Sequence, residues 1–85
     1  MEHELKIKQC FLIHLLEDKK HFEIRKNDRD FQVGDTISFI PLEDDSYDVY
    51  KEYSAPLPHA KIIYVHTGLG MQDGYAALDL KFIDT

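Results

Sequence analysis

Strand-like hydrophobic periodicity runs through most of this chain, and helical periodicity occurs in one short segment. Residues 10–17 place apolar side chains at i, i+1, i+4 and i+5, which is typical of a short, mostly buried helix. Elsewhere the apolar side chains alternate with polar ones or form short β-rich runs. The predicted strands cover residues 4–8, 21–27, 36–40, 60–67 and 75–83, and the acidic, irregular residues 43–58 form a loop or an edge hairpin.

The segments between the predicted strands are too short for repeated crossover helices, so a doubly wound sheet is not expected. With 85 residues, of which 44% are hydrophobic, the chain has enough apolar material for one core and not for two domains of ordinary size. Closing a sheet on itself removes its exposed strand edges. We therefore predict that residues 1–85 form one domain of mainly β (α+β) class, a small closed or partly closed β-barrel of about five to six strands. The one short helix near the N-terminus would plug one end of the barrel.

The charge of the chain is unevenly distributed. The whole sequence carries −6, which argues against a general nucleic-acid coat that works by counterion release. Residues 19–29 nevertheless hold five basic and two acidic side chains, a local charge of +3. An acidic body with one basic segment suits a small, local anionic target better than a long duplex. The structural alternative is a basic turn that simply stays hydrated.

Within this basic segment, residues 21–27 return to strand alternation. Phe22 and Ile24 fall on one side of the predicted strand, and Glu23 and Arg25 fall on the other. We expect the two apolar side chains to enter the core and the two charged ones to share the solvent face, within reach of a ligand. Taken on the residues alone, an ion pair between Glu23 and Arg25 that only orients the strand is the alternative.

Metal, cofactor and membrane roles find no support in the sequence. The lone cysteine, Cys10, cannot form an internal disulfide and is interpreted as core filler rather than a nucleophile. The five histidines show no metal-ligand spacing, so we expect no metal and no cofactor. Since no apolar run approaches the roughly 18 residues of a membrane span, and the N-terminus is charged rather than signal-like, a cytoplasmic protein without membrane contact is predicted.

Residues 18–25 resemble the signature of the ASCH domain, named for homology to activating signal cointegrator. In that signature a glycine is followed at set spacing by lysine, glutamate and arginine. Lys20, Glu23 and Arg25 fill three of these positions, and Asp18 stands where the glycine is expected. The chain is more closely similar to a small bacterial and phage family of unknown function within the same superfamily, through residues 3–7, 22–35 and a glycine loop at 68–75.

The resemblance implies a PUA-like β-barrel whose cleft, lined by the lysine, glutamate and arginine, binds RNA or a nucleotide. Arg25 would grip a phosphate or stack on a base, Lys20 would neutralise a second phosphate oxygen, and Glu23 would accept hydrogen bonds from a base or ribose. We expect the loop at residues 68–74 to close the groove from the other side. The predicted nucleic-acid-binding residues are Lys19, Lys20, Glu23, Arg25, Lys26 and Arg29.

Two other classes of function stay open. Some relatives in the superfamily are small amidohydrolases that act on acylated cytidine, in which a lysine activates a threonine three residues further on. Glu23 stands at that threonine position, so their mechanism does not transfer, although hydrolysis of a modified nucleoside or RNA by Lys20 and Glu23, or nuclease chemistry with a histidine base, is an alternative to binding. The second alternative is a protein-interaction module that uses the acidic, tyrosine-bearing residues 43–58. Of the three, binding without catalysis is the preferred hypothesis.

Overall fold

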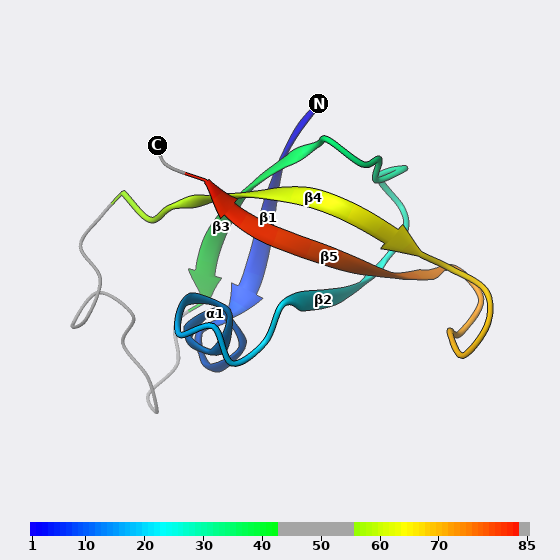
Figure 1. The fold of residues 1–85 in the computed structure, drawn as a ribbon, viewed down its shortest axis with the longest axis horizontal. Helices are drawn as coiled ribbons and strands as arrows, with labels where there is room; N and C mark the ends of the chain where they lie inside the picture. Colours follow the sequence, from blue (N-terminus) through cyan, green and yellow to red (C-terminus); the bar gives the residue numbers. More distant parts are fainter. Residues whose placement is uncertain (43–55, 84–85) are drawn as a thin grey trace.

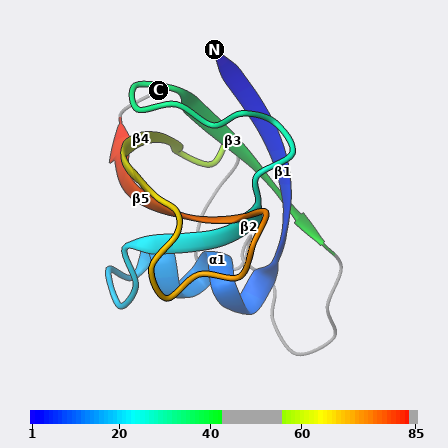
Figure 2. The same ribbon diagram turned by 90° about the vertical axis from the view of Figure 1, so that its right-hand side faces the viewer.

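The computed structural model describes residues 1–42 and 56–83 as five strands and one short helix (Figure 1). The strands form one sheet in the order β1-β3-β4-β5-β2, which curls into a half-barrel (Figure 2). The mainly β prediction, with one helix near the N-terminus, is confirmed. Residues 43–55, which hold most of the predicted loop or edge hairpin, lie outside the described residues. In chain order the elements are β1 (Glu2–Lys8), α1 (Gln9–Leu16), β2 (Phe22–Lys26), β3 (Thr36–Leu42), β4 (His59–His66) and β5 (Tyr75–Ile83).

The sheet is mixed, and its pairing follows from the connections. β1 and β3 pair in parallel, and α1, β2 and the following loop provide the long connection that a parallel pair needs. β4 and β5 form a hairpin across the glycine-containing loop, and β2 pairs antiparallel with β5. β1 and β2 occupy the two ends of the strand order, so of the two predicted forms, closed or partly closed, the structure has the partly closed one, with two strand edges.

The hydrophobic core lies on the concave face of the sheet. β1 alternates strictly between exposed and buried residues, with Leu5 and Ile7 inward, and α1 adds Leu12 and Leu15 to the same core. Phe31 enters it from the segment between β2 and β3. The members contributed by the other strands are Ile37, Phe39, Ala60, Ile62, Ala76, Leu78 and Leu80. Within the described parts of the chain, no helix is long and apolar enough to cross a membrane.

The alternation predicted for β2 is present, but the predicted assignment of its two faces is wrong. Phe22 and Ile24 are 48% and 51% exposed, whereas Glu23 is only 4% exposed. Glu23 lies directly opposite the buried Leu78 of β5, and opposite residues of an antiparallel pair share a face of the sheet. Because Leu78 and Ala76 of β5 face the core, the residues opposite them, Glu23 and Arg25, lie on the concave side of the sheet. Periodicity gives the spacing of the two faces and not which of them is inside.

Candidate functional site

The two edges of the half-barrel are bridged by arginine side chains. The Thr36 N–H donates to the Met1 carbonyl, so the backbone carbonyls of the odd-numbered residues of β1 point toward β3. The carbonyls of the even-numbered residues Glu4 and Lys6 therefore point away from the sheet at its edge. Arg25 of β2 donates from Nη1 to the Lys6 carbonyl at 2.8 Å. Arg29 donates from Nη1 to the Glu4 carbonyl at 2.6 Å. Side-chain hydrogen bonds therefore link β2 and the loop after it to β1, two strands that do not pair with each other.

Glu23 is the centre of an ionic cluster at this seam. One carboxylate oxygen accepts from Lys20 Nζ at 3.1 Å, and the other accepts from Arg25 Nη1 at 3.4 Å. A buried carboxylate is costly unless cations and hydrogen bonds compensate it, and these two side chains do so. Lys20 Nζ also lies 4.6 Å from the ring centroid of Phe11 and 5.5 Å from that of Phe22. We refer to Lys20, Glu23 and Arg25 as the Lys-Glu-Arg cluster.

The Lys-Glu-Arg cluster is accessible through its cations. The side chains of Lys20 and Arg25 are 20% and 25% exposed, whereas that of Glu23 is 6% exposed. A lysine ammonium has three donors and a guanidinium has five N–H groups, so the contacts described above leave donors on both. With two cations around one carboxylate, the cluster carries a net positive charge that an incoming anion can meet. Glu23 is better placed to orient the two cations than to touch a ligand itself.

The other predicted binding residues are only partly gathered here. Arg29 reaches the same seam from the loop after β2. Lys19 lies 3.8 Å from Glu17 in an exposed ion pair, away from Glu23. Lys26 is exposed and has the strand parity of the outward-facing Phe22 and Ile24. The structure thus brings together Lys20, Glu23, Arg25 and Arg29, and leaves Lys19 and Lys26 apart.

A small hollow lies beside Lys20 and was not predicted. Its volume is about 190 Å³, and its lining is formed by Leu15, Asp18, Lys20, His21, Leu80, Lys81 and Phe82. Lys81 belongs to the last strand and comes near Lys20 only because β5 pairs with β2. The alternation of β5 marks Lys81 as lying outside the core, but nothing in the sequence connects it to Lys20. We call this the Lys20 hollow.

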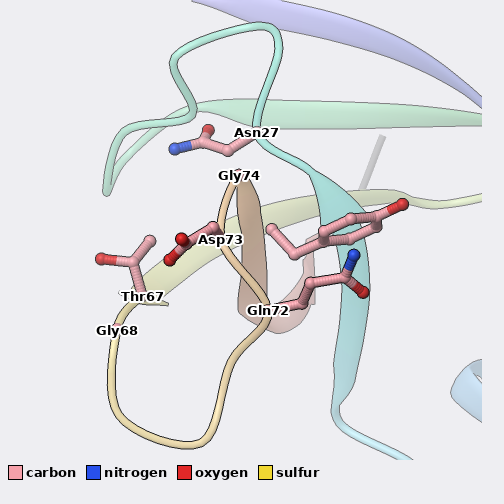
Figure 3. A pocket seen from close by; sticks show the side chains of 7 residues that line it. Asn27, Thr67, Gly68, Gln72, Asp73 and Gly74 are labelled. Atoms are coloured by element: carbon pink, nitrogen blue, oxygen red, sulfur yellow. The ribbon is translucent and has the colours of Figure 1, made fainter.

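A larger hollow of about 340 Å³ lies between the β4–β5 loop and the end of β2 (Figure 3). The loop is held there by a hydrogen bond from the Asn27 N–H to the Gly74 carbonyl at 2.7 Å. None of Lys20, Arg25 and Arg29 lines this hollow, so the loop and these basic residues do not form the walls of a single hollow, although the loop lies at the Asn27 end of β2. We call it the glycine-loop hollow, lined by Asn27, Thr67, Gly68, Gln72, Asp73, Gly74 and Tyr75.

A buried acid with a lowered pKa lies elsewhere, directly before β3. Asp35 and His3 form a buried pair, with His3 Nε2 at 2.8 Å from Asp35 Oδ2. This hydrogen bond, with those from the Gln32 N–H and the terminal amine, lowers the pKa of Asp35 to about 2, although burial raises it. Since both side chains are less than a tenth exposed, the pair joins β1 to β3 and offers no access to a substrate. No group of three potential metal ligands occurs in residues 1–42 and 56–83.

Comparison with known proteins places this architecture in a family. A family model described as a domain of unknown function (DUF3850) matches residues 2–80, a span that includes all the residues of the Lys-Glu-Arg cluster and of the glycine-loop hollow. No curated protein matches the chain.

Proposed function

The chain belongs to the family described as a domain of unknown function (DUF3850), and we propose that it is a PUA-like, ASCH-type domain that binds RNA or a nucleotide. The observation that carries the proposal is the Lys-Glu-Arg cluster. Lys20, Glu23 and Arg25, which the ASCH resemblance designates, lie in one hydrogen-bonded group at the open seam of the sheet. The lone, half-buried Cys10 agrees with a reducing compartment, so we propose a cytoplasmic setting.

The chemistry of the cluster favours a phosphate-bearing ligand. Arg25 presents a planar guanidinium whose orientation is set by the Glu23 carboxylate and the Lys6 carbonyl. Lys20 adds a second cation, positioned by Glu23 and by the rings of Phe11 and Phe22. Cations held in place before binding lose less side-chain entropy on contact with a ligand than mobile ones do. A site of this size contacts few phosphates, which agrees with the negative charge of the rest of the chain.

Arg25 has two roles in this proposal, and the test has to separate them. It donates to the β1 edge, so its removal also weakens the seam. Lys61 provides a control, because it is exposed on β4 and lies outside the basic segment. Unfolding curves for each variant define a temperature at which wild-type protein and variants are all folded, and binding is compared there.

The experiment measures fluorescence anisotropy with short single-stranded RNA, structured RNA, duplex DNA and free nucleotides over a range of salt concentrations. We expect modest affinity for single-stranded RNA, and a slope of log affinity against log salt of about −0.7 for each phosphate contacted. Arg25→Ala should weaken binding by roughly 10- to 150-fold, the loss of one charge-assisted contact. Arg25→Lys should weaken it nearly as much, because lysine keeps the charge but lacks the planar fork. Lys61→Ala should have little effect, because long-range fields are screened within about 8 Å.

Three outcomes contradict the proposal in different ways. Equal losses from Arg25→Ala and Lys61→Ala would mean non-specific electrostatic attraction. Absence of binding to every RNA and nucleotide would leave the protein-interaction module as the better hypothesis. Product formation in the same incubations, abolished by Glu23→Gln in folded protein, would identify a hydrolase instead of a binding domain.

A further inference from the structure

The glycine-loop hollow has walls that are braced by the backbone. Within the loop, the Met71 N–H donates to the Gly68 carbonyl at 2.8 Å, and the Tyr75 N–H donates to the Gln72 carbonyl at 3.0 Å. Gly68 and Gly74 have φ of +88° and +82°, values that a residue with a Cβ adopts at an energetic cost. Together with the bond from Asn27 to Gly74, these turns give the loop a defined shape against the end of β2.

Polar side chains with free hydrogen-bonding capacity converge on this hollow. Asn27 Oδ1 accepts from the Phe31 N–H at 3.2 Å, which assigns the amide oxygen and leaves the Asn27 NH₂ group as an available donor. In the described residues, the side chains of Thr67 and Asp73 make no hydrogen bond. Figure 3 shows the Asn27 amide, the Asp73 carboxylate and the Thr67 hydroxyl around one side of the loop. A ligand there would meet an obligate acceptor, a donor and a hydroxyl that can act as either.

This set of groups selects against phosphate and in favour of a nucleobase. No cation lines the hollow, and the Asp73 carboxylate would repel an anion. A carboxylate accepts hydrogen bonds from an exocyclic amine, and an amide NH₂ donates to a ring nitrogen or carbonyl of a base. The volume of about 340 Å³ lies at the lower end for small-ligand pockets and suits one base rather than several.

We propose that the glycine-loop hollow binds a single nucleobase bearing an exocyclic amine, with Asp73 accepting from that amine. This inference rests on the proposed function, because the phosphates of the same ligand would contact the Lys-Glu-Arg cluster. Arg25 lies in β2, two residues before Asn27, and it is opposite Ala76, the second residue of β5 after the loop. Asp73 is thereby a specificity residue, and Arg25 supplies affinity that does not depend on the base.

The test compares binding of equal-length oligo-rC, oligo-rA and oligo-rU by the whole protein. Uracil carries a carbonyl where cytosine carries its amine, so wild-type protein should bind oligo-rC tighter than oligo-rU by roughly fivefold or more. Asp73→Asn should bring the ratio of the two affinities to within about twofold of one. Removing a negative charge raises affinity for every RNA, and this effect cancels in the ratio. Glu2→Gln, which removes one exposed negative charge on β1, is the matched control and should leave the ratio unchanged.

The outcomes distinguish this inference from the function on which it rests. Equal affinity of wild-type protein for oligo-rC, oligo-rA and oligo-rU, or an unchanged ratio in Asp73→Asn, would overturn the base site. If Arg25→Ala weakened RNA binding by roughly 10- to 150-fold in that case, the proposed function would stand without the base site. If wild-type protein bound none of the three oligonucleotides, both would be overturned together.

Discussion

Replacing Asp35 with asparagine should destabilise the domain by about 2 kcal/mol at neutral pH. The Asp35 side chain is 9% exposed, and its carboxylate accepts hydrogen bonds from His3 Nε2 at 2.8 Å and from the Gln32 N–H at 3.1 Å. His3 Nε2 must carry the proton, because an ionised carboxylate only accepts. Asparagine keeps the size of the side chain and the acceptor oxygen that meets His3 and Gln32, whereas its NH₂ group takes the place of the oxygen that accepts from the terminal amine. The variant therefore removes the charge and one exposed contact.

The magnitude follows from the pKa of Asp35, which falls from 3.8 to about 2 in the folded protein. That interval corresponds to about 2 kcal/mol of stabilisation when the carboxylate is ionised. The ammonium of Met1 is 75% exposed and contributes the least of the partners, because water screens it. An 85-residue domain has a free energy of unfolding of roughly 4 to 13 kcal/mol, so the loss is a large fraction of it. The midpoint of thermal unfolding should fall by roughly 8 to 16 °C.

The pH dependence of this loss has a definite sign. Because the folded pKa of Asp35 lies below the unfolded one, the stabilisation is complete above pH 3.8 and disappears as the pH falls toward 2. Urea unfolding should therefore give the same difference in free energy of unfolding between wild type and Asp35→Asn at pH 7 and pH 5, and a smaller difference at pH 3. Asp28→Asn, at an exposed carboxylate in the adjacent loop, is the control. A difference below about 0.5 kcal/mol at pH 7, within the range of ordinary surface substitutions, would refute the reasoning, as would one that persists unchanged at low pH.

Two further predictions concern the faces and the edges of the sheet. Ile62→Ala should lower the free energy of unfolding by about 2 to 5 kcal/mol, because the Ile62 side chain is fully buried. Ile24→Ala should lower it by less than about 1 kcal/mol, because Ile24 is half exposed. If urea unfolding showed a larger loss of stability for Ile24→Ala than for Ile62→Ala, the face assignment predicted from the sequence would be favoured. Arg29→Ala should lower the free energy of unfolding by about 1 kcal/mol and accelerate amide hydrogen exchange in β1, because the Glu4 carbonyl at the edge loses its hydrogen-bond donor. Unchanged exchange would show that other contacts hold this edge.

The local order of elements was predictable because it depends on near-neighbour patterns. The helical spacing of residues 10–17 and the alternation at residues 4–8 identified α1 and β1 to within one or two residues. The short connections excluded a doubly wound sheet and favoured a small closed or partly closed barrel, and the observed half-barrel agrees with the partly closed form. Lys20, Glu23 and Arg25 were identified as a group by resemblance, and their proximity requires only three-residue and two-residue spacings within one segment.

Tertiary structure alone decided which face of β2 is inside and what its side chains meet. Alternation has a period of two residues, but it does not say which of the two faces is buried. Whether Phe22 or Glu23 faces the core depended on the pairing of Glu23 with Leu78, more than fifty residues away. The bonds from Arg25 and Arg29 to β1 depend on the curl of a sheet whose edge strands never pair in the described chain. The glycine-loop hollow likewise joins Asn27 to Asp73, and no local pattern links residues so far apart. The sequence by itself therefore determined the elements and the polar groups available to them, whereas long-range packing determined which of those groups face the core, the seam or a ligand.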